Sequence, residues 1–406
     1  MLDQKIKVGR FRLIDHKGRV YDAGDGTGPQ VTVKLTGAKT ALFLALKPEL
    51  ALGECYMDGT LRFEEGDLAG LLDLVGQTHK PKLKRSLFKR MRLAAMRQLE
   101  QWNDRDVSKK NVAHHYDISN VLYRRFLDPD MNYSCAYFAR PDMSLEEAQA
   151  AKKAHIAAKL DLRDGLKVLD IGSGWGGLGL DIASRAKVEV LGVTLSERQH
   201  ELANQRAEAK GVADRVKFAL RDYRDVDGPF DRIVSVGMFE HVGRPNYDTF
   251  FTTAARLLKD DGVMLLHSIG RSHRPGITNS WLKKYIFPGG YCPSLSEVLT
   301  SIEKSGLLVT DIEILRIHYA ETCKAWRERF QAQWDEIAAE YDQAFCRMFD
   351  YYLLTSEITF RHLNFMVFQI QMAKSVNTLP ITRDYIAETE AAYMTQAAAP
   401  ELARAG

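Results

Sequence analysis

Short apolar segments alternate with helical patterns in the middle of this 406-residue chain. The helical pattern over residues 197–210 is typical of the stretches between them. This alternation predicts a mostly parallel sheet with helices on both faces. Ligands of such sheets bind beyond the carboxyl ends of the strands, so residues at those ends are candidates for function. The predicted strands cover residues 167–171, 188–193, 216–220, 231–235 and 262–267.

A glycine-rich segment, residues 170–177 (DIGSGWGG), follows the first of these strands. Gly172 and Gly174 allow a tight turn that brings backbone amides close to a ligand at a helix N-terminus. A dinucleotide site would place an acid at the end of the second strand, but that strand ends at Thr194. After the third strand, residues 222–223 (Asp-Tyr) can accept from an adenine amine and cover the base. The alternative interpretation is that these glycines only form the turn between a strand and a helix and bind no ligand.

The N-terminal part of the chain has a different pattern, and 406 residues exceed what one hydrophobic core usually supports. Residues 31–35 and 41–46 are predicted as strands, and residues 24–28 as a loop. Residues 1–78 are therefore expected to form a small α+β domain. The first residues carry no apolar segment of the signal-peptide kind, so secretion is not expected.

A basic segment follows in residues 80–97, within a predicted linker over residues 79–110. Its apolar residues recur at helical spacing, so it is predicted as an amphipathic helix. One interpretation is a solvated helix between two domains, and the other is a helix on anionic lipid. The net charge of +3 is too small to indicate nucleic acid as a partner. The basic residues are Lys80, Lys82, Lys84, Arg85, Lys89, Arg90, Arg92 and Arg97.

The five cysteines are odd in number and widely scattered along the chain. This spacing argues against a disulfide framework and against a zinc cluster, so no metal site is predicted. Buried thiols in a reducing, cytoplasmic compartment are expected instead. The cysteines are Cys55, Cys135, Cys292, Cys323 and Cys346.

Four further segments stand around the glycine turn: residues 115–117 (HYD), 131–138 (MNYSCAYF), 237–243 (GMFEHVG) and 265–270 (LLHSIG), supported by 192–196 and 284–289. In this order they closely resemble the cyclopropane-fatty-acyl-phospholipid synthase family of S-adenosylmethionine-dependent methyltransferases. The resemblance implies an α/β, Rossmann-like fold with a seven-stranded, mostly parallel sheet and a smaller N-terminal α+β domain. It also implies a catalytic domain over residues 111–390 that includes C-terminal aromatic helices.

The family resemblance implies transfer of a methylene group from S-adenosylmethionine to the cis double bond of a phospholipid acyl chain. The double bond attacks the sulfonium methyl, a carbocation forms, and a bound bicarbonate acts as general base before the ring closes. The carried-over residues around that anion are Cys135, Glu240, His267, Ile269 and Tyr319. Taken singly, the thiol and the imidazole are more often buried core groups, and the glutamate could cap a helix.

The cosubstrate residues carry over in the same way. The resemblance implies contacts to the methionine end, the ribose, the carboxylate and the adenine of S-adenosylmethionine. These residues are Tyr133, Ser134, Asp170, Gly172, Gly174, Gly176, Thr194, Gln199, Asp222 and Tyr223. One departure concerns a late cysteine that some relatives carry after a Tyr-Tyr-Leu run. Ser356 stands at about that place here, so a covalent role for that thiol is excluded.

The resemblance further implies a peripheral enzyme on the inner face of the membrane that acts on unsaturated acyl chains and can form a homodimer. Three alternatives remain open at this stage. The first is a related fatty-acyl methyltransferase whose product is a methyl-branched, methylene or hydroxylated chain. The second is a small-molecule methyltransferase, and the third is a lipid-binding protein that keeps an inactive methyltransferase fold.

Overall fold

The structure is a computed structural model that describes residue 6, residues 8–78 and residues 119–398. The basic segment at 80–97 and the motif at 115–117 lie outside the described residues. Contacts divide the chain into two compact units. The first unit contains the N-terminal residues together with residues 276–288 and 320–365. The second contains residues 100–275, 289–319 and 366–406, of which the structure describes those after 118 and before 399.

The first unit contains a four-stranded sheet in the order β2-β1-β3-β4. Strands β1 and β3 run parallel, and the other neighbours run antiparallel. Its hydrophobic core includes Val31, Val33 and Leu35, which are almost fully buried. The strands are β1 (Arg10–Ile14), β2 (Val20–Ala23), β3 (Gln30–Leu35) and β4 (Leu61–Glu65).

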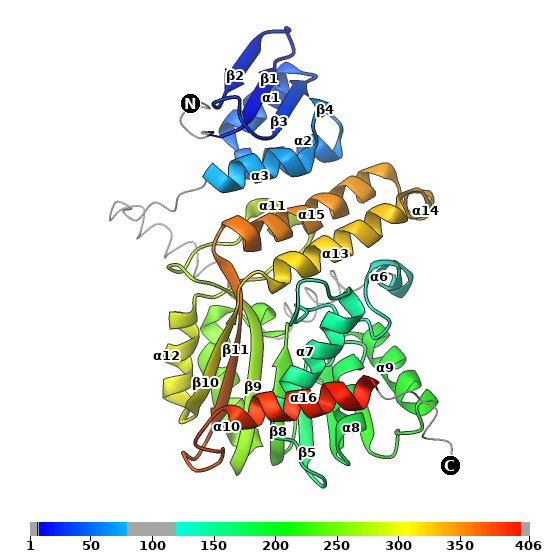
Figure 1. Ribbon diagram of the computed structural model, residues 1–406, viewed down its shortest axis with the longest axis vertical. Helices are drawn as coiled ribbons and strands as arrows, with labels where there is room; N and C mark the ends of the chain where they lie inside the picture. The colour runs from blue at the N-terminus through cyan, green and yellow to red at the C-terminus, as the bar shows by residue number, and fades with distance from the viewer. Residues whose placement is uncertain (1–5, 7, 79–118, 399–406) are drawn as a thin grey trace. The chain divides into compact units, whose positions relative to one another are not determined.

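Helices from three separate parts of the sequence complete this unit (Figure 1). The prediction of a strand over residues 41–46 is wrong, because they belong to helix α1. An apolar run of this length does not distinguish a strand from a helix, and Ala and Leu favour the helix. The helices are α1 (Ala38–Leu46), α2 (Pro48–Met57), α3 (Leu68–Thr78), α11 (Ser280–Tyr285), α13 (His318–Ala332), α14 (Trp334–Glu340) and α15 (Gln343–His362).

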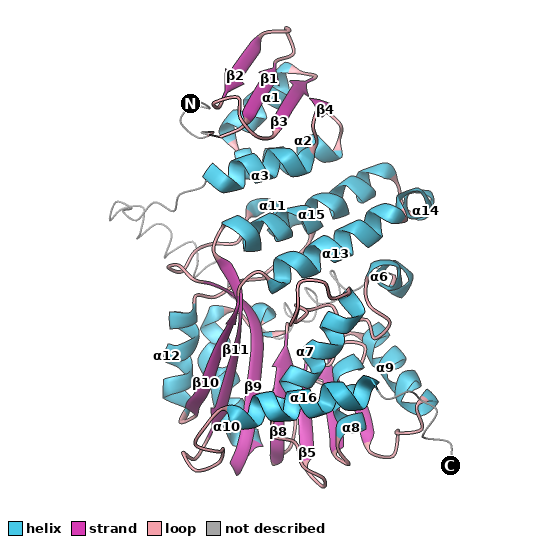
Figure 2. Cartoon of the chain, viewed as in Figure 1, coloured by secondary structure: helices cyan, strands magenta, loops and turns pink. Residues whose placement is uncertain are grey.

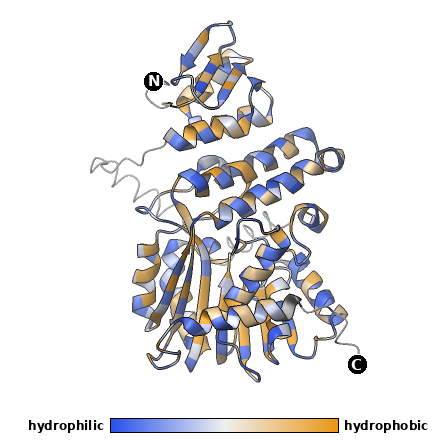
Figure 3. Ribbon diagram, in the orientation of Figure 1, coloured by the Kyte–Doolittle hydropathy of each residue, from blue (hydrophilic) through white to orange (hydrophobic). Residues whose placement is uncertain are grey.

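A buried carboxylate joins the late helices to the N-terminal segment. Asp350 of α15 is 2% exposed. It accepts hydrogen bonds from Arg327 Nε at 2.7 Å, Gln331 Nε2 at 2.9 Å and the Tyr56 hydroxyl at 3.2 Å. Hydrophilic and hydrophobic residues alternate along α13 and α15 (Figure 3), as expected for helices that pack on one side. The unit thus takes in residues 320–365, whereas the linear prediction grouped them with the catalytic domain.

The second unit is built on a seven-stranded sheet in the order β10-β11-β9-β8-β5-β6-β7 (Figure 2). Strands β7, β6, β5, β8 and β9 pair in parallel, and β10 and β11 pair antiparallel. The five strands predicted from the sequence are all present. They are β5 (Lys167–Ile171), β6 (Glu189–Thr194), β7 (Val216–Leu220), β8 (Phe230–Val236) and β9 (Leu258–Arg271), followed by β10 (Leu308–Leu315) and β11 (Phe365–Ala373).

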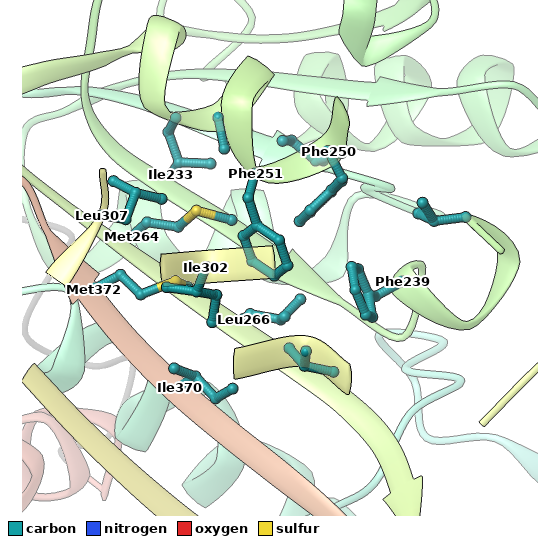
Figure 4. Packing of buried hydrophobic residues seen from close by; sticks show 14 of the residues in the cluster. Ile233, Phe239, Phe250, Phe251, Met264, Leu266, Ile302, Leu307, Ile370 and Met372 are labelled. Carbon is teal, nitrogen blue, oxygen red and sulfur yellow. The ribbon is translucent and has the colours of Figure 1, made fainter. Parts of the chain in front are cut away.

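Hydrophobic clusters cover both faces of this sheet. Phe250 and Phe251 of α10 pack with Met264, Leu266 and other residues on one face (Figure 4). Residues of α7, α8 and α9 form the cluster on the opposite face. The helices of this unit are α6 (Asn120–Phe126), α7 (Leu145–Lys159), α8 (Gly177–Arg185), α9 (Glu197–Ala209), α10 (Tyr247–Leu257), α12 (Leu295–Ser305) and α16 (Asp384–Ala398), with short 3-10 turns η1 (Tyr223–Asp225), η2 (Phe239–His241) and η3 (Arg244–Asn246).

The C-terminal part of the chain differs from the predicted helical pattern in one place. Residues 365–373 form strand β11, which lies between β10 and β9 in the sheet. This strand is nearly all buried, with alternate residues facing the two sides of the sheet. No helix among the described residues is long and apolar enough to span a membrane.

Candidate active site

The turn after β5 is shaped by glycines with positive φ angles. Gly172, Gly174 and Gly176 have φ angles of 85°, 54° and 81°, which side chains disfavour. A Cβ on Gly172 would lie 2.6 Å from Cβ of Met238, so this position also needs a small residue. The turn leads directly into α8, whose N-terminal amides favour a negative or polar ligand group.

A cavity of about 150 Å³ lies at the carboxyl ends of β5, β6 and β8. Most of the residues predicted to contact the cosubstrate line this cavity. They are Tyr133, Ser134, Asp170, Gly172, Gly174, Thr194, Gln199, Asp222 and Tyr223. Gly176 is not among the lining residues, and a Cβ there would meet Phe218 and Ala203. The structure therefore assigns Gly176 a packing position at the start of α8.

Polar side chains of the cavity are held by specific partners. Thr194 Oγ1 donates to Gln199 Oε1 at 2.8 Å, which links the end of β6 to the first turn of α9. Asp222 accepts from the guanidinium of Arg224 at 2.6 Å and from the backbone amide of Arg224 at 2.9 Å. The Asp222 carboxylate is thus oriented at the lining, beside the Tyr223 ring. These contacts hold polar groups of Thr194, Gln199 and Asp222 at the wall of the cavity.

Two charged residues of opposite sign lie in the cavity wall. Lys152 of α7 donates to Ser134 Oγ at 3.0 Å and Asn132 Oδ1 at 3.3 Å. Burial lowers the pKa of Lys152 to about 8. Burial raises the pKa of Asp170 to about 7, against the charge of Lys152. Because Asp170 Oδ2 is buried without a hydrogen-bond partner, its carboxyl is available to a cationic ligand.

Glu240 lies in η2, after β8, next to a residue of the cavity wall. Its Oε1 accepts from the backbone amide of Ile269 at 2.6 Å, whereas its Oε2 is buried without a partner. Burial raises the pKa of Glu240 to about 7. The amide of Ile269 is therefore engaged by Glu240, and the carboxyl can carry a proton near neutral pH.

His267 and Ile269 are both on β9, and the structure brings Ile269 and Glu240 into direct contact. The His267 carbonyl also accepts from the amide of Gly237, a lining residue, at 3.0 Å. The His267 ring is 2% exposed, and burial holds its pKa well below the usual value.

Cys135 and Tyr319 are buried as well, outside the set of lining residues. The Cys135 thiol donates to the Ala136 carbonyl at 3.3 Å, directly beyond the lining residue Ser134. Tyr319 lies in the first turn of α13. Four of the five residues of the predicted anion site are thus buried, and Ile269 is half-buried. All of them except Tyr319 lie on segments that reach the cavity or pair with such segments.

Several lining residues were not predicted from the sequence. Lys152 stands in a helix with Lys153 and Lys159, where charge alone indicates a solvated face, yet all three side chains are buried. His241, next to Glu240, also lines the cavity, and burial lowers its pKa to about 4. One signal in the sequence could have indicated that these lysines are buried: they lie in a helix that is rich in alanine. Other lining residues without a prediction include Asn132, Trp175, Arg221, Met238 and Asn246.

The model of the family described as mycolic acid cyclopropane synthetase matches residues 63–370. The cyclopropane-fatty-acyl-phospholipid synthase of Escherichia coli K12 is 41% identical over 346 residues, which cover 82% of this chain and 86% of that protein. The tuberculostearic acid methyltransferase of Mycobacterium tuberculosis is 36% identical over 366 residues, 86% of this chain and 84% of that protein. The crystal structure of the mycolic acid cyclopropane synthase CmaA1 complexed with SAH and CTAB aligns with a TM-score of 0.62 at 37% identity, over 65% of this chain and 97% of that one. With the Rossmann-like fold and the strand-end cavity, these likenesses show that the chain belongs to the mycolic acid cyclopropane synthetase family.

Proposed function

We propose that this protein transfers a methylene group from S-adenosylmethionine to the cis double bond of phospholipid acyl chains and so forms a cyclopropane ring. The observation that carries this proposal is the 41% identity with the Escherichia coli cyclopropane-fatty-acyl-phospholipid synthase over 82% of the chain. The strand-end cavity supports it with a turn, polar walls and a buried carboxyl that suit a nucleoside with a cationic centre.

In this proposal S-adenosylmethionine occupies the cavity as cosubstrate. Asp222 and Tyr223 face its adenine, Thr194 and Gln199 its ribose and carboxylate sides, and Ser134 its methionine end. The double bond attacks the sulfonium methyl, S-adenosylhomocysteine leaves, and the acyl carbocation closes to a ring after it loses a proton. The protein must hold the alkene in line with the methyl group and keep water away from the cation.

The proton acceptor in this proposal is bicarbonate, held by Cys135, Glu240, His267, Ile269 and Tyr319. The residues present fit such a group, because Glu240 Oε2 is buried without a partner and its carboxyl has a pKa of about 7. A protonated Glu240 donates a hydrogen bond to an anion instead of repelling it. When bound, bicarbonate would supply the base for the proton that leaves the new methyl group.

Incubation with labelled S-adenosylmethionine and vesicles of unsaturated phospholipid tests the reaction. We expect the acyl chains to gain a methylene group and the rate to fall when bicarbonate is removed. Acyl chains that gain no label would contradict the proposed reaction. A labelled product formed at the same rate without bicarbonate would contradict the assigned base and leave the transfer intact.

A second candidate is transfer that ends in a methyl-branched or methylene chain. It is favoured by the 36% identity with the tuberculostearic acid methyltransferase over 86% of this chain. Mass spectrometry of the products identifies a reduced methyl branch, because it carries two more hydrogens than a ring. A methylene chain has the same mass as the ring, and proton NMR separates these two by the vinyl signals of the methylene group.

We also propose that helix α1 docks the protein on the membrane surface. Leu42 and Leu46 are 60% and 71% exposed and lie one helical turn apart. Lys39 and Lys47, both exposed, flank these leucines, so an apolar ridge stands between two positive charges. Such a pattern suits the headgroup region of an anionic bilayer. This surface supports a peripheral enzyme, and the inner face of the membrane is the side that we propose for it.

Sedimentation with vesicles tests this docking surface. Leu42→Ser together with Leu46→Ser should weaken binding to vesicles that contain phosphatidylglycerol, because both apolar contacts are lost. The matched control is Val376→Ser, which removes an exposed apolar side chain from the second unit. Equal binding of the double variant and the unaltered protein would contradict the proposal.

Sedimentation equilibrium in the same buffers tests the predicted homodimer.

A further inference from the structure

Three buried polar side chains, those of His267, Gln369 and Lys159, are connected by hydrogen bonds. They lie on the sheet face opposite to the cluster of Figure 4. The alternation of β9 and β11 sends Leu266, Phe368 and Ile370 into that cluster. The intervening residues His267 and Gln369 therefore face the other side, where α7 provides Lys159. Gln369 and Lys159 are fully buried at 0% exposure, so water does not satisfy them.

The donor in each of these hydrogen bonds determines the donor in the next one. Lys159 Nζ donates to Gln369 Oε1 at 2.9 Å, and Gln369 Nε2 lies 3.2 Å from His267 Nδ1. An ammonium group can only donate, so the atom of Gln369 that faces Lys159 is the amide oxygen. The amide nitrogen of Gln369 then faces His267 and donates to Nδ1. A ring that accepts at Nδ1 is neutral and carries its proton on Nε2.

Lys159 is held in place by charges and by a neighbouring glutamine. It pairs with Glu313 and lies 3.8 Å from Asp311, while its backbone carbonyl accepts from Gln371. Burial raises the pKa of Glu313, but hydrogen bonds from His155 and Lys159 and their charges outweigh burial and lower it to about 2. Glu313 is therefore ionised at neutral pH and keeps the ammonium group beside it.

The charges around the ring favour the same state. Lys152, Lys159 and His155 disfavour a proton on His267, and Glu313 alone among these groups favours one. Burial and these positive charges together hold the pKa of His267 well below its usual value and favour the neutral ring.

We propose that Gln369 is a positioning residue: oriented by Lys159, its amide donates to His267 Nδ1 and fixes the tautomer that offers Nε2–H to an anion. This inference rests on the proposed function, because it takes bicarbonate as the anion at His267. The opposite tautomer would present a lone pair to the anion and repel it. Gln369 lies on β11 and Lys159 on α7, outside the motifs that led to the family resemblance.

Nitrogen-15 NMR of the histidine rings tests the tautomer without reference to activity. The His267 signals are identified as those lost in His267→Asn. We expect the neutral form with the proton on Nε2 from pH 6 to pH 8. In Gln369→Glu the donor is replaced by an acceptor, so the proton should move to Nδ1 or the ring should become charged. Gln77→Glu is the control for the change of amide to carboxylate, since Gln77 is an exposed residue of the first unit.

The kinetic arm measures how activity depends on bicarbonate concentration. Gln369→Glu should raise the concentration for half-maximal rate at least tenfold, with little change in binding of S-adenosylhomocysteine. Should Gln369→Glu not fold, Gln369→Asn takes its place, because it keeps the donor but withdraws it from Nδ1. A proton on Nδ1 in the unaltered protein, or an unchanged ring in a folded Gln369 variant, would overturn the inference. If the tautomer is as expected but the rate does not depend on bicarbonate concentration, the assignment of the ring proton holds and the proposed base is wrong.

Discussion

Burial changes the proton affinity of several single residues around the cavity. It raises the pKa of Asp170 and of Glu240 to about 7, and it lowers the pKa of Lys152 to about 8. In each case the environment disfavours the charged form. The sequence indicated Asp170 and Glu240 from their motifs, but it did not reveal Lys152, because its burial depends on how α7 packs.

Binding of S-adenosylmethionine should depend on pH through Asp170. The sulfonium group favours an ionised carboxyl, and with a pKa of about 7 Asp170 is mostly protonated at pH 6. We expect the dissociation constant to rise roughly tenfold from pH 8 to pH 6, one protonation step over this range. Isothermal titration calorimetry at both values measures it. Asp170→Asn should bind weakly with a much smaller pH dependence, and an equally steep dependence in that variant would rule out Asp170 as the cause.

Glu240 should affect both activity and stability. A raised pKa means that the folded state holds the proton more tightly, so its stabilisation is complete below pH 4.5 and is lost as pH rises through 7. Between pH 5 and pH 8 this loss amounts to roughly 2 to 3 kcal/mol in the free energy of unfolding. Glu240→Gln cannot ionise, so it does not lose this stability. Its free energy of unfolding, relative to that of the unaltered protein, should therefore rise by the same amount from pH 5 to pH 8.

Urea unfolding at pH 5 and pH 8 gives the difference between the two proteins. In activity, Glu240→Gln should exceed Glu240→Ala, because the amide still donates a hydrogen bond. Equal pH slopes for the unaltered protein and Glu240→Gln would show that Glu240 is already ionised in the fold.

At the scale of secondary structure, the periodic parts of the chain were predictable and the ambiguous ones were not. The strands from β5 to β9 were predicted because each is a short apolar run between helical patterns. Helix α1 was taken for a strand because six apolar residues carry no period of their own. Strand β11 was missed because it directly follows the long helix α15, and pairing with distant β9 and β10 decides its conformation.

The turn between β5 and α8 offers a comparison of two glycines. Gly172→Ala combines a positive φ with a contact of 2.6 Å to Met238, whereas an alanine Cβ at Gly174 would meet nothing within 4 Å. Gly174→Ala should therefore cost only the backbone strain, about 1 to 2 kcal/mol. Gly172→Ala should cost more and also abolish binding of S-adenosylhomocysteine, as measured by thermal unfolding with and without ligand. Similar losses in both variants would contradict the steric argument.

On the scale of the whole molecule, the chain folds into two units that do not follow its order in sequence. The first unit needs residues from three separate segments, and Asp350 joins two of them. The sequence predicted an N-terminal α+β domain but not the helices that complete it, since their partners are nearly 300 residues away, as in the Tyr56–Asp350 pair with a separation of 294. Local patterns do not report such pairs.

Removal of the Asp350 carboxylate should destabilise the first unit selectively. Asp350→Ala leaves half-buried Arg327 without this acceptor, a change that costs less than the roughly 3 to 5 kcal/mol of a fully buried pair. Differential scanning calorimetry should show a lowered transition that S-adenosylhomocysteine does not raise, because the cavity proposed for this ligand lies in the second unit. If the ligand and the substitution move the same transition, the two units unfold as one.

The discontinuous first unit has a consequence for synthesis of the protein in the cell. When Tyr56 leaves the ribosome, its partner Asp350 has still to be translated, 294 residues later. At about 5 to 20 residues per second, this delay lasts roughly 15 to 60 seconds. During that interval the surfaces of α2 and α3 that later meet α15 are exposed to water. Nascent chains of this protein therefore leave these surfaces of α2 and α3 uncovered until α15 has left the ribosome.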